Sequence, residues 1–147
     1  MNTKVTSALV IITSLFAVGA QAEEVTPEKS TRECMFATQS HNWQVLDRQR
    51  LVLWGPSQND AYLVTLFAPV NDLPFAETLV FVDSDHNGSI CGGGFDKIGV
   101  AQSMSGTWPM HIQSMEKLDD AALLVLGEKY NVKLLSSKRI KALQEGK

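Results

Sequence analysis

The sequence predicts an α+β domain: a small antiparallel β-sheet or partly open barrel with a C-terminal helix, tied by one disulfide bond. Three observations lead to this prediction. Short, apolar, β-rich segments alternate with turn-forming residues through the middle of the chain. A segment with helical spacing lies near the C-terminus. The chain has two cysteines, Cys34 and Cys91, and an intramolecular bond can join them in one way only.

The N-terminus has the pattern of a secretory signal peptide. Lys4 supplies a positive charge, an apolar run extends from Ala8 to Gly19, and Ala20-Gln21-Ala22 forms an A-x-A cleavage site. The apolar run is too short to span a bilayer comfortably. We therefore expect residues 1–22 to be removed, with a short uncut membrane anchor as the alternative.

Cleavage after Ala22 defines the mature chain. We expect residues 23–33 to form a flexible N-terminus and residues 34–147 to form a single disulfide-tied domain, with a helical extension from about residue 119. No membrane span remains after cleavage. The predicted location is the periplasm, with the extracellular space as the alternative.

The charge of the chain excludes one class of partner. The net charge is −3 at pH 7, and the signal peptide holds one of the positive charges. A mildly acidic mature chain is not typical of nucleic-acid binding. The segment from Lys133 to Lys147 is locally basic, which we interpret as a solvated helix face.

The predicted strands occupy the central part of the chain. Residues 43–46 are ambiguous between a helical turn and a strand, and two prolines make residues 69–76 a connector. Residues 89–91 are expected to return against the strand that precedes them. The strand segments are residues 50–54, 61–67, 78–82, 89–91, 97–101 and 108–115.

The helix prediction depends on its caps. Asp119 is a suitable N-cap for residues 120–129, and Asn131 suits the C-terminal cap. Leu123, Leu126 and Tyr130 fall on one side at helical spacing. Residues 136–145 are expected to form a second, short, basic helix.

The segment Asp83–Asp96, DSDHNGSICGGGFD, raises the question of a metal. Its first ligand positions match an EF-hand loop at Asp83, Asp85 and Asn87, followed by glycine at position 6. Position 12, which needs a bidentate acid, is Gly94, and Asp96 comes two residues too late.

A turn explains the same residues without a metal. Asn87-Gly88 between two β-rich segments is typical of a type I′ hairpin turn, which needs positive φ at both central residues. The run Gly92-Gly93-Gly94 lacks the lysine and helix of a phosphate loop, so we interpret it as a bulge or tight corner. We expect no cofactor and keep a calcium site at Asp83, Asp85 and Asn87 as the alternative.

Two further groups of residues are candidates for function. Cys91 could act as a nucleophile or redox thiol, but an exported chain with two cysteines and no C-x-x-C motif favours a disulfide. Trp43, Trp54 and Trp108 could line a ligand groove, although tryptophans of a small β domain more often belong to its core.

A series of short motifs runs from Cys34 to about Met115: Cys34-x-Phe36, Trp43 with Leu46-Asp47, Val52-Leu53-Trp54, Tyr62-x-Val64-x-Leu66, Pro69 with Leu73 and Phe75-Ala76, Cys91-Gly92-x-Gly94-x-Asp96, and Ile112-x-Ser114. This series resembles a bacterial family of small exported proteins of unknown function, DUF6491. The resemblance brings no known activity. It makes the chain beyond Met115 look like an extension particular to this protein.

The departures from that family concern cysteines. Members carry two further cysteines where this chain has Val70 and Met110. The resemblance therefore implies two bonds in the family, equivalent to 34–91 and 70–110, and supports a Cys34–Cys91 bond here.

Three function classes follow from the sequence. The first is a periplasmic, non-catalytic binding or interaction domain with a protein or small-molecule partner. The second is a calcium-stabilised module that uses the loop at Asp83, Asp85 and Asn87. The third is a thiol-based redox protein or enzyme that uses Cys91.

Overall fold

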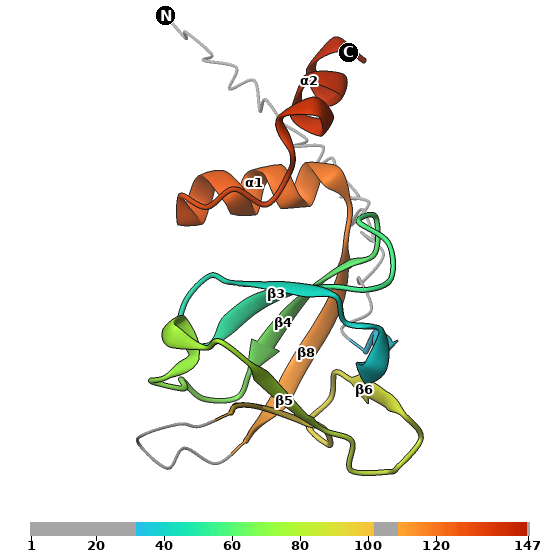
Figure 1. The fold of residues 1–147 in the computed structure, drawn as a ribbon, viewed down its shortest axis with the longest axis vertical. Coiled ribbons are helices and arrows are strands. Elements are labelled where there is room, and N and C mark those ends of the chain that lie inside the picture. Colours follow the sequence, from blue (N-terminus) through green and yellow to red (C-terminus); the bar gives the residue numbers. More distant parts are fainter. Residues whose placement is uncertain (1–31, 102–108, 147) are drawn as a thin grey trace, which may run out of the picture.

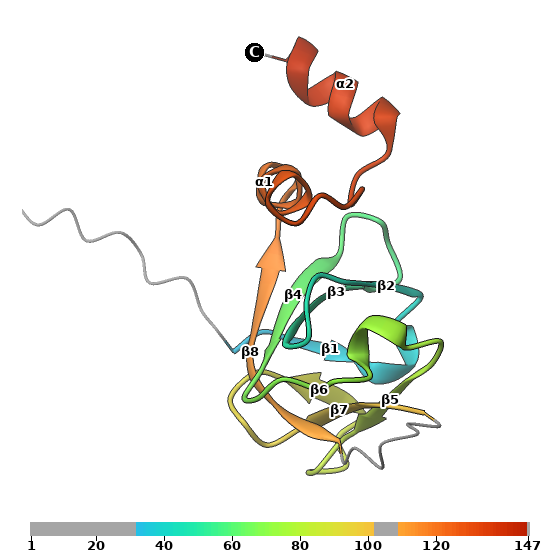
Figure 2. The same ribbon diagram turned by 90° about the vertical axis from the view of Figure 1, so that its left-hand side faces the viewer.

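The computed structural model describes residues 32–101 and 109–146. Its main element is a six-stranded antiparallel sheet with the strand order β2-β3-β4-β8-β7-β5, curved into a half-barrel (Figure 1). A two-stranded sheet, β1-β6, lies beside it, and two helices follow β8 (Figure 2). The predicted α+β class, its antiparallel sheet and its disulfide are confirmed. Among the described residues, no helix is long and apolar enough to cross a membrane.

Most elements follow the sequence predictions, but β1 was not predicted as a strand and β8 ends at Leu118, beyond the predicted end at residue 115. Residues 43–46, which were ambiguous, lie in a strand or directly after it. The strands are β1 (Cys34–Phe36), β2 (Asn42–Val45), β3 (Arg50–Trp54), β4 (Ala61–Leu66), β5 (Leu79–Val82), β6 (Ser89–Cys91), β7 (Lys97–Val100) and β8 (Met110–Leu118), and the helices are the 3-10 turns η1 (Ala37–Gln39) and η2 (Leu73–Phe75), α1 (Asp120–Tyr130) and α2 (Ser137–Glu145).

Strand β3 is apolar on both faces because each face meets a different layer. Leu51 and Leu53 belong to the main core, which the half-barrel forms with residues such as Ile90 of β6. Val52 faces the other way, into a second cluster that contains Leu123 of α1. The sheet is therefore covered by a helix on one side, which explains why the strand sequence does not alternate.

The predicted pairing of residues 89–91 is wrong. Strand β6 pairs with β1, where Met35 faces Ile90, and β5 pairs with β7 instead. The predicted type I′ turn is also absent, because the positive φ angles in the described loop occur at His86 and Gly88 and not at two adjacent residues. The Gly88 N–H instead donates to the Asp83 carboxylate, at 2.6 Å, which closes a wider loop.

The disulfide bond joins Cys34 to Cys91, which face each other across the β1-β6 pair. It ties the first strand to a residue 57 positions later. Val70 and Met110 both pack in the main core, so apolar side chains occupy the positions at which the resemblance implies a second bond.

Helix α1 has both predicted caps, and Ser136, predicted as the first residue of the second helix, is instead its N-cap. The Asp119 carboxylate accepts a hydrogen bond from the Ala122 N–H, and Asn131 ends α1 in the left-handed conformation at φ 52°. Ser136 caps α2. Helix α1 lies across the end of the sheet, and α2 projects beyond it in both views (Figures 1 and 2).

Candidate functional site

A cleft with a volume of about 530 Å³ opens where the edge of the sheet meets the linker between the helices. We call it the Trp54 cleft. One wall comes from the start of β2 and from the β3–β4 loop, and the other comes from residues 133–136 and the start of α2. Its polar lining includes Asn42, Gln44, Ser57, Gln58 and Arg139.

The register of the sheet decides which tryptophan reaches this cleft. Trp54 pairs with Asn42 and lies half-buried against the second cluster. Trp43 pairs with Leu53 and packs against the main core, on the opposite face of the sheet. Trp108 lies outside the described residues. Of the three tryptophans that sequence analysis singled out, the described structure places only Trp54 in a cleft.

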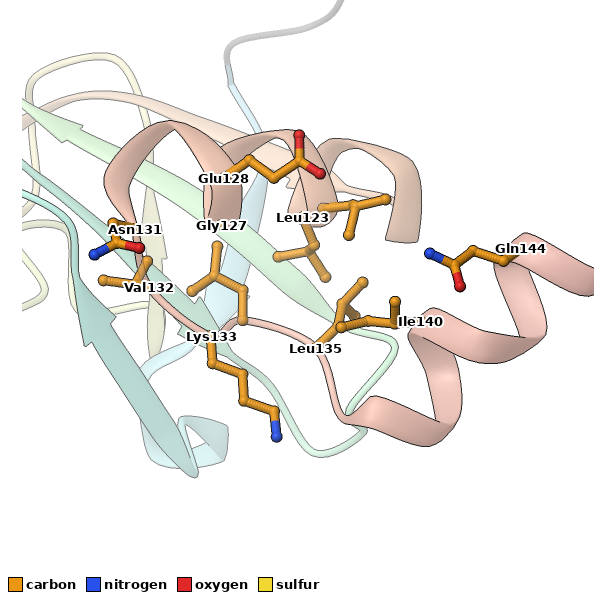
Figure 3. Close-up of a pocket in the computed structure, with 11 residues that line it drawn as sticks. Leu123, Gly127, Glu128, Asn131, Val132, Lys133, Leu135, Ile140 and Gln144 are labelled. Carbon is orange, nitrogen blue, oxygen red and sulfur yellow. The ribbon is translucent and has the colours of Figure 1, made fainter.

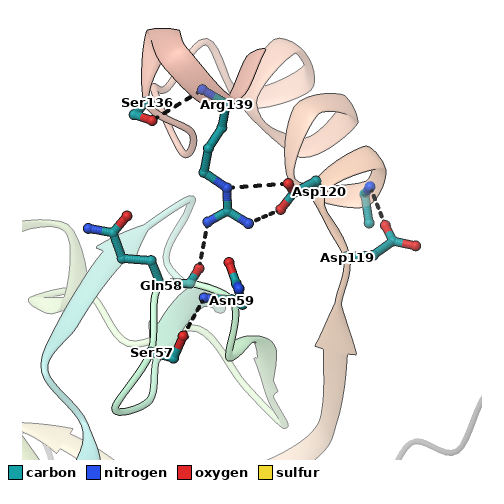
Figure 4. Close-up of polar contacts among 8 residues, drawn as sticks. Ser57, Gln58, Asn59, Asp119, Asp120, Ser136 and Arg139 are labelled. Atoms are coloured by element: carbon teal, nitrogen blue, oxygen red, sulfur yellow. Dashed lines mark hydrogen bonds and ion pairs between the residues drawn. The ribbon is translucent and has the colours of Figure 1, made fainter. Parts of the chain in front are cut away.

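Arg139 fixes the two walls of the cleft to each other. Its guanidinium forms a bidentate ion pair with Asp120 at the start of α1, and Nη1 donates to the Gln58 carbonyl at 2.8 Å (Figure 4). Bidentate pairs of this kind are geometrically specific. The first turn of α2 is thereby held against both α1 and the β3–β4 loop.

The β3–β4 loop is braced from its other side. Lys117 of β8 forms an ion pair with Asp60 at 3.0 Å, and the hydrogen bond from this contact raises the pKa of Lys117. The Gly55 N–H donates to the Asp60 carbonyl at 2.7 Å. These contacts give the cleft a preformed wall.

The end of α1 is fixed to the sheet by a hydrogen bond between Tyr130 and Arg50 of β3. Nη1 of Arg50 donates to the Tyr130 hydroxyl at 2.6 Å, and this hydrogen bond raises the pKa of Arg50. The linker then turns closely past the helix: a Cβ atom at Gly127 would lie 2.9 Å from the Val132 carbonyl oxygen. The sequence between the helices is therefore packed, with Leu134 and Leu135 buried.

A second pocket, also of about 530 Å³, lies between α1 and α2 (Figure 3). Its lining is mainly apolar and includes Leu123, Val132 and Ile140. Lys133, Leu134 and Leu135 line both this pocket and the Trp54 cleft. The linker thus separates an apolar pocket from a polar, aromatic one.

The loops around β6 gather three carboxylates. Asp83, Asp85 and Asp96 each offer an oxygen, and these three atoms lie within 4.8 Å of one another. This spacing is compatible with one Ca²⁺ ion, whose oxygen ligands lie at about 2.3–2.6 Å. The sequence pattern missed Asp96, which falls at the wrong position for an EF-hand and enters the cluster through the fold.

The side chain of Asn87, which the sequence predicts as a calcium ligand, forms hydrogen bonds within the loop. Its amide Nδ2 donates to Asp85 Oδ2 at 2.8 Å, and its Oδ1 accepts from the Ser89 N–H at 2.7 Å. The amide is therefore engaged in shaping the loop. Asp83 and Asp85 of the predicted set lie with Asp96 in one carboxylate cluster.

Two of these carboxylates have distinct environments. Asp96 is 3% exposed and accepts the backbone N–H groups of Ser84 and Cys91, both at 2.9 Å. Asp83 Oδ1 is buried and has no hydrogen-bond partner in the described structure. Burial tends to raise the pKa of Asp83, but hydrogen bonds, the strongest from the Gly88 N–H, outweigh it and lower that pKa.

The three glycines after Cys91 form a tight corner, as predicted. Gly93 and Gly94 have φ angles of 108° and 92°, which favour glycine. Their N–H groups donate to the carbonyls of Gln113 and Ile112. Because these two N–H groups are hydrogen-bonded to β8, they are not available to bind an anion. The role of the corner is structural.

The sulfur of Cys91 is bonded to Cys34, and no described cysteine is free. In this state Cys91 has no thiolate to act as a nucleophile.

The fold and the sites define a small, disulfide-tied half-barrel with a helical cap. The chain belongs to DUF6491, a family of unknown function, whose model matches residues 1–129. The match runs past Met115 through most of α1, which corrects the expectation that the extension begins there; residues 130–147 lie beyond it. No curated protein and no solved structure matches the chain.

Proposed function

We propose that the mature protein is an exported, non-catalytic binding domain whose ligand site is the Trp54 cleft. The observation that supports this proposal is the construction of the cleft. An aromatic side chain and several amide and hydroxyl groups line a concave site whose walls are held together by the Arg139 contacts. Concave sites with an apolar surface and a few fixed polar groups are typical of small-molecule binding.

The N-terminal sequence supports export to the periplasm. The residues up to Ala22 have the charge, apolar run and cleavage site of a signal peptide. A disulfide between Cys34 and Cys91 is also typical of an oxidising compartment. In a Gram-negative host we expect the protein in the periplasmic fraction with Glu23 as its first residue; a full-length, membrane-associated chain would contradict this.

Native mass spectrometry of protein purified from the periplasm tests the binding function. We expect a bound small molecule on the wild type, its loss in Trp54→Ala, and its retention in the control Trp43→Phe, whose side chain lies on the opposite face of the sheet. A ligand that stays bound to a folded Trp54→Ala variant would place the site elsewhere. If the wild type carries no adduct and is not stabilised by the small-molecule fraction of the cell, the proposed function fails.

A second candidate function is calcium binding at Asp83, Asp85 and Asp96. The specific observation in its favour is the buried, unpartnered Oδ1 of Asp83 beside two further carboxylates. A bound ion stabilises the folded state by mass action. Calcium at millimolar concentration should raise the melting temperature relative to chelator, and Asp85→Asn should reduce this rise while the exposed control Glu77→Gln leaves it unchanged. An equal melting temperature in calcium and in chelator would exclude this function.

A further inference from the structure

We propose that the ligand of the Trp54 cleft is a saccharide, an inference that rests on the binding function proposed above. Carbohydrate rings have a face of C–H bonds and a rim of hydroxyl groups. A site that holds them needs a flat apolar surface next to groups that both donate and accept hydrogen bonds. The cleft offers this combination.

Trp54 supplies the flat surface. Its side chain is half-buried and packs against the second cluster, which fixes the indole from beneath. Indole rings present a large, rigid apolar area at low entropic cost, because the side chain has two rotatable bonds. The cleft volume of about 530 Å³ gives room for a short oligosaccharide beside this ring.

The amide side chains of β2 are oriented by their own backbone. Asn42 Oδ1 accepts a hydrogen bond from the Trp43 N–H at 2.9 Å, which leaves its amide NH₂ to donate. Gln44 Nε2 donates to the Val45 carbonyl at 3.2 Å, which leaves its side-chain oxygen to accept. The cleft therefore combines a donor and an acceptor, two residues apart on one strand, as recognition of hydroxyl groups requires.

The hydroxyl of Ser57 is oriented in the same way. Its oxygen accepts from the Asn59 N–H at 3.2 Å, so that its own O–H can donate to a ligand. Together with the two amides, this makes three uncharged polar groups whose orientation is set before a ligand arrives. Preorganised groups of this kind reduce the entropy lost on binding.

The charges of the cleft are compatible with a neutral or weakly acidic ligand. Among the described residues, the lining contains no Asp or Glu, which disfavours a cationic ligand. Arg139 is already paired with Asp120, whereas Lys133 donates to the neutral Ser137 hydroxyl at 3.2 Å and keeps its positive charge. A polyanion would have to compete for the arginine, whereas a neutral or weakly acidic saccharide leaves it in place.

One wall of the cleft is formed by residues that lie outside the part of the chain matched by the family model. Lys133, Ser136 and Arg139 all lie beyond residue 129, where the match to the family ends. The half-barrel provides Trp54 and the amides, and the segment after α1 closes the cleft. We infer that this segment contributes to the choice of saccharide.

Isothermal titration calorimetry of the mature protein tests the proposal with three uncharged probes: maltotetraose, cellotetraose and N-acetylchitotetraose. We expect at least one to bind. Trp54→Ala should weaken it by at least about tenfold, because it removes the stacking surface. Trp54→Phe, which keeps an aromatic face, should weaken it less, and Trp43→Phe should have no effect. Gln44→Ala, which removes the acceptor oxygen from the cleft, should weaken it independently.

The alternatives are separated by a second probe, the amphiphilic dye 8-anilinonaphthalene-1-sulfonate. If no tetrasaccharide binds but the dye binds in a manner that Trp54→Phe or Gln44→Ala alters, the saccharide class is wrong and the binding site stands. If neither the sugars nor the dye responds to any of these variants, both proposals are refuted. Saccharide binding that is unaffected in Trp54→Phe and Gln44→Ala would likewise overturn the assignment to this cleft.

Discussion

The Cys34–Cys91 bond should contribute a large share of the stability of the fold. It closes a loop across 57 positions of the sequence. In the chain-entropy model, a crosslink of this span lowers the entropy of the unfolded chain enough to stabilise the native state by about 4 kcal/mol. The total stability of a domain is roughly 5–15 kcal/mol, so removal of the bond should leave a folded but marginal protein.

Urea denaturation of the double variant Cys34→Ala/Cys91→Ala measures this contribution. We expect the free energy of unfolding to fall by about 4 kcal/mol and the melting temperature to fall by roughly 15 °C. The slope of the free energy against urea should increase, because an unfolded chain without the crosslink exposes more surface. Reduced wild-type protein is the control and should match the variant.

The reasoning fails if the double variant loses less than about 1 kcal/mol with an unchanged slope. Ile90→Ala gives a comparison for local packing. Ile90 is fully buried beside the bond, and its truncation should lower stability by about 2–5 kcal/mol without changing the unfolded state. An increased slope in the cysteine variant and not in Ile90→Ala would identify the unfolded chain as the origin of the effect.

Three further changes test single contacts by denaturation. Asp96→Asn should lower the free energy of unfolding by about 1–3 kcal/mol, because an amide oxygen can replace one but not both of the carboxylate oxygens that accept the N–H groups of Ser84 and Cys91; unchanged stability would refute this. Asn131→Ala should cost about 1 kcal/mol at φ 52°, whereas Asn131→Gly should cost nothing; equal effects would contradict the cap. Gly94→Ala should lower the free energy of unfolding, because the backbone φ of 92° strains alanine and its Cβ would lie 3.0 Å from the Phe67 ring. Adding Phe67→Ala to this variant should relieve the contact but not the backbone strain. If the double variant were no less stable than Phe67→Ala alone, the role of φ would be refuted.

The local elements of the fold could be predicted because their signals are local. Asp119 and Asn131 mark the two ends of α1 since each satisfies or permits a specific backbone geometry at that residue. Strands β3 and β4 are short apolar segments separated by the turn at Gly55–Asp60. The pairing of Cys34 with Cys91 follows from their number.

The candidate sites were only partly predictable. Trp54 and Trp43 look equivalent in the sequence, but they lie on opposite faces of the sheet. Trp43 pairs with Leu53 and shares its face, and because side chains alternate along a strand, Trp54 points to the other face. The spacing of Asp96 from Asp83 does not fit an EF-hand loop. Asp96 joins the carboxylate cluster because the corner at Gly93 and Gly94 turns the chain back toward the loop.

The sequence by itself determined most strand segments, both helices, the caps of α1, the disulfide partners and membership of DUF6491. The tertiary structure decided that β6 pairs with β1, that Asp96 joins Asp83 and Asp85, and that Trp54 meets the linker after α1. The physical reason is the range of the interactions. Caps and turns depend on a few neighbouring residues, whereas strand partners and shared sites depend on contacts between distant segments that form only when the whole core packs.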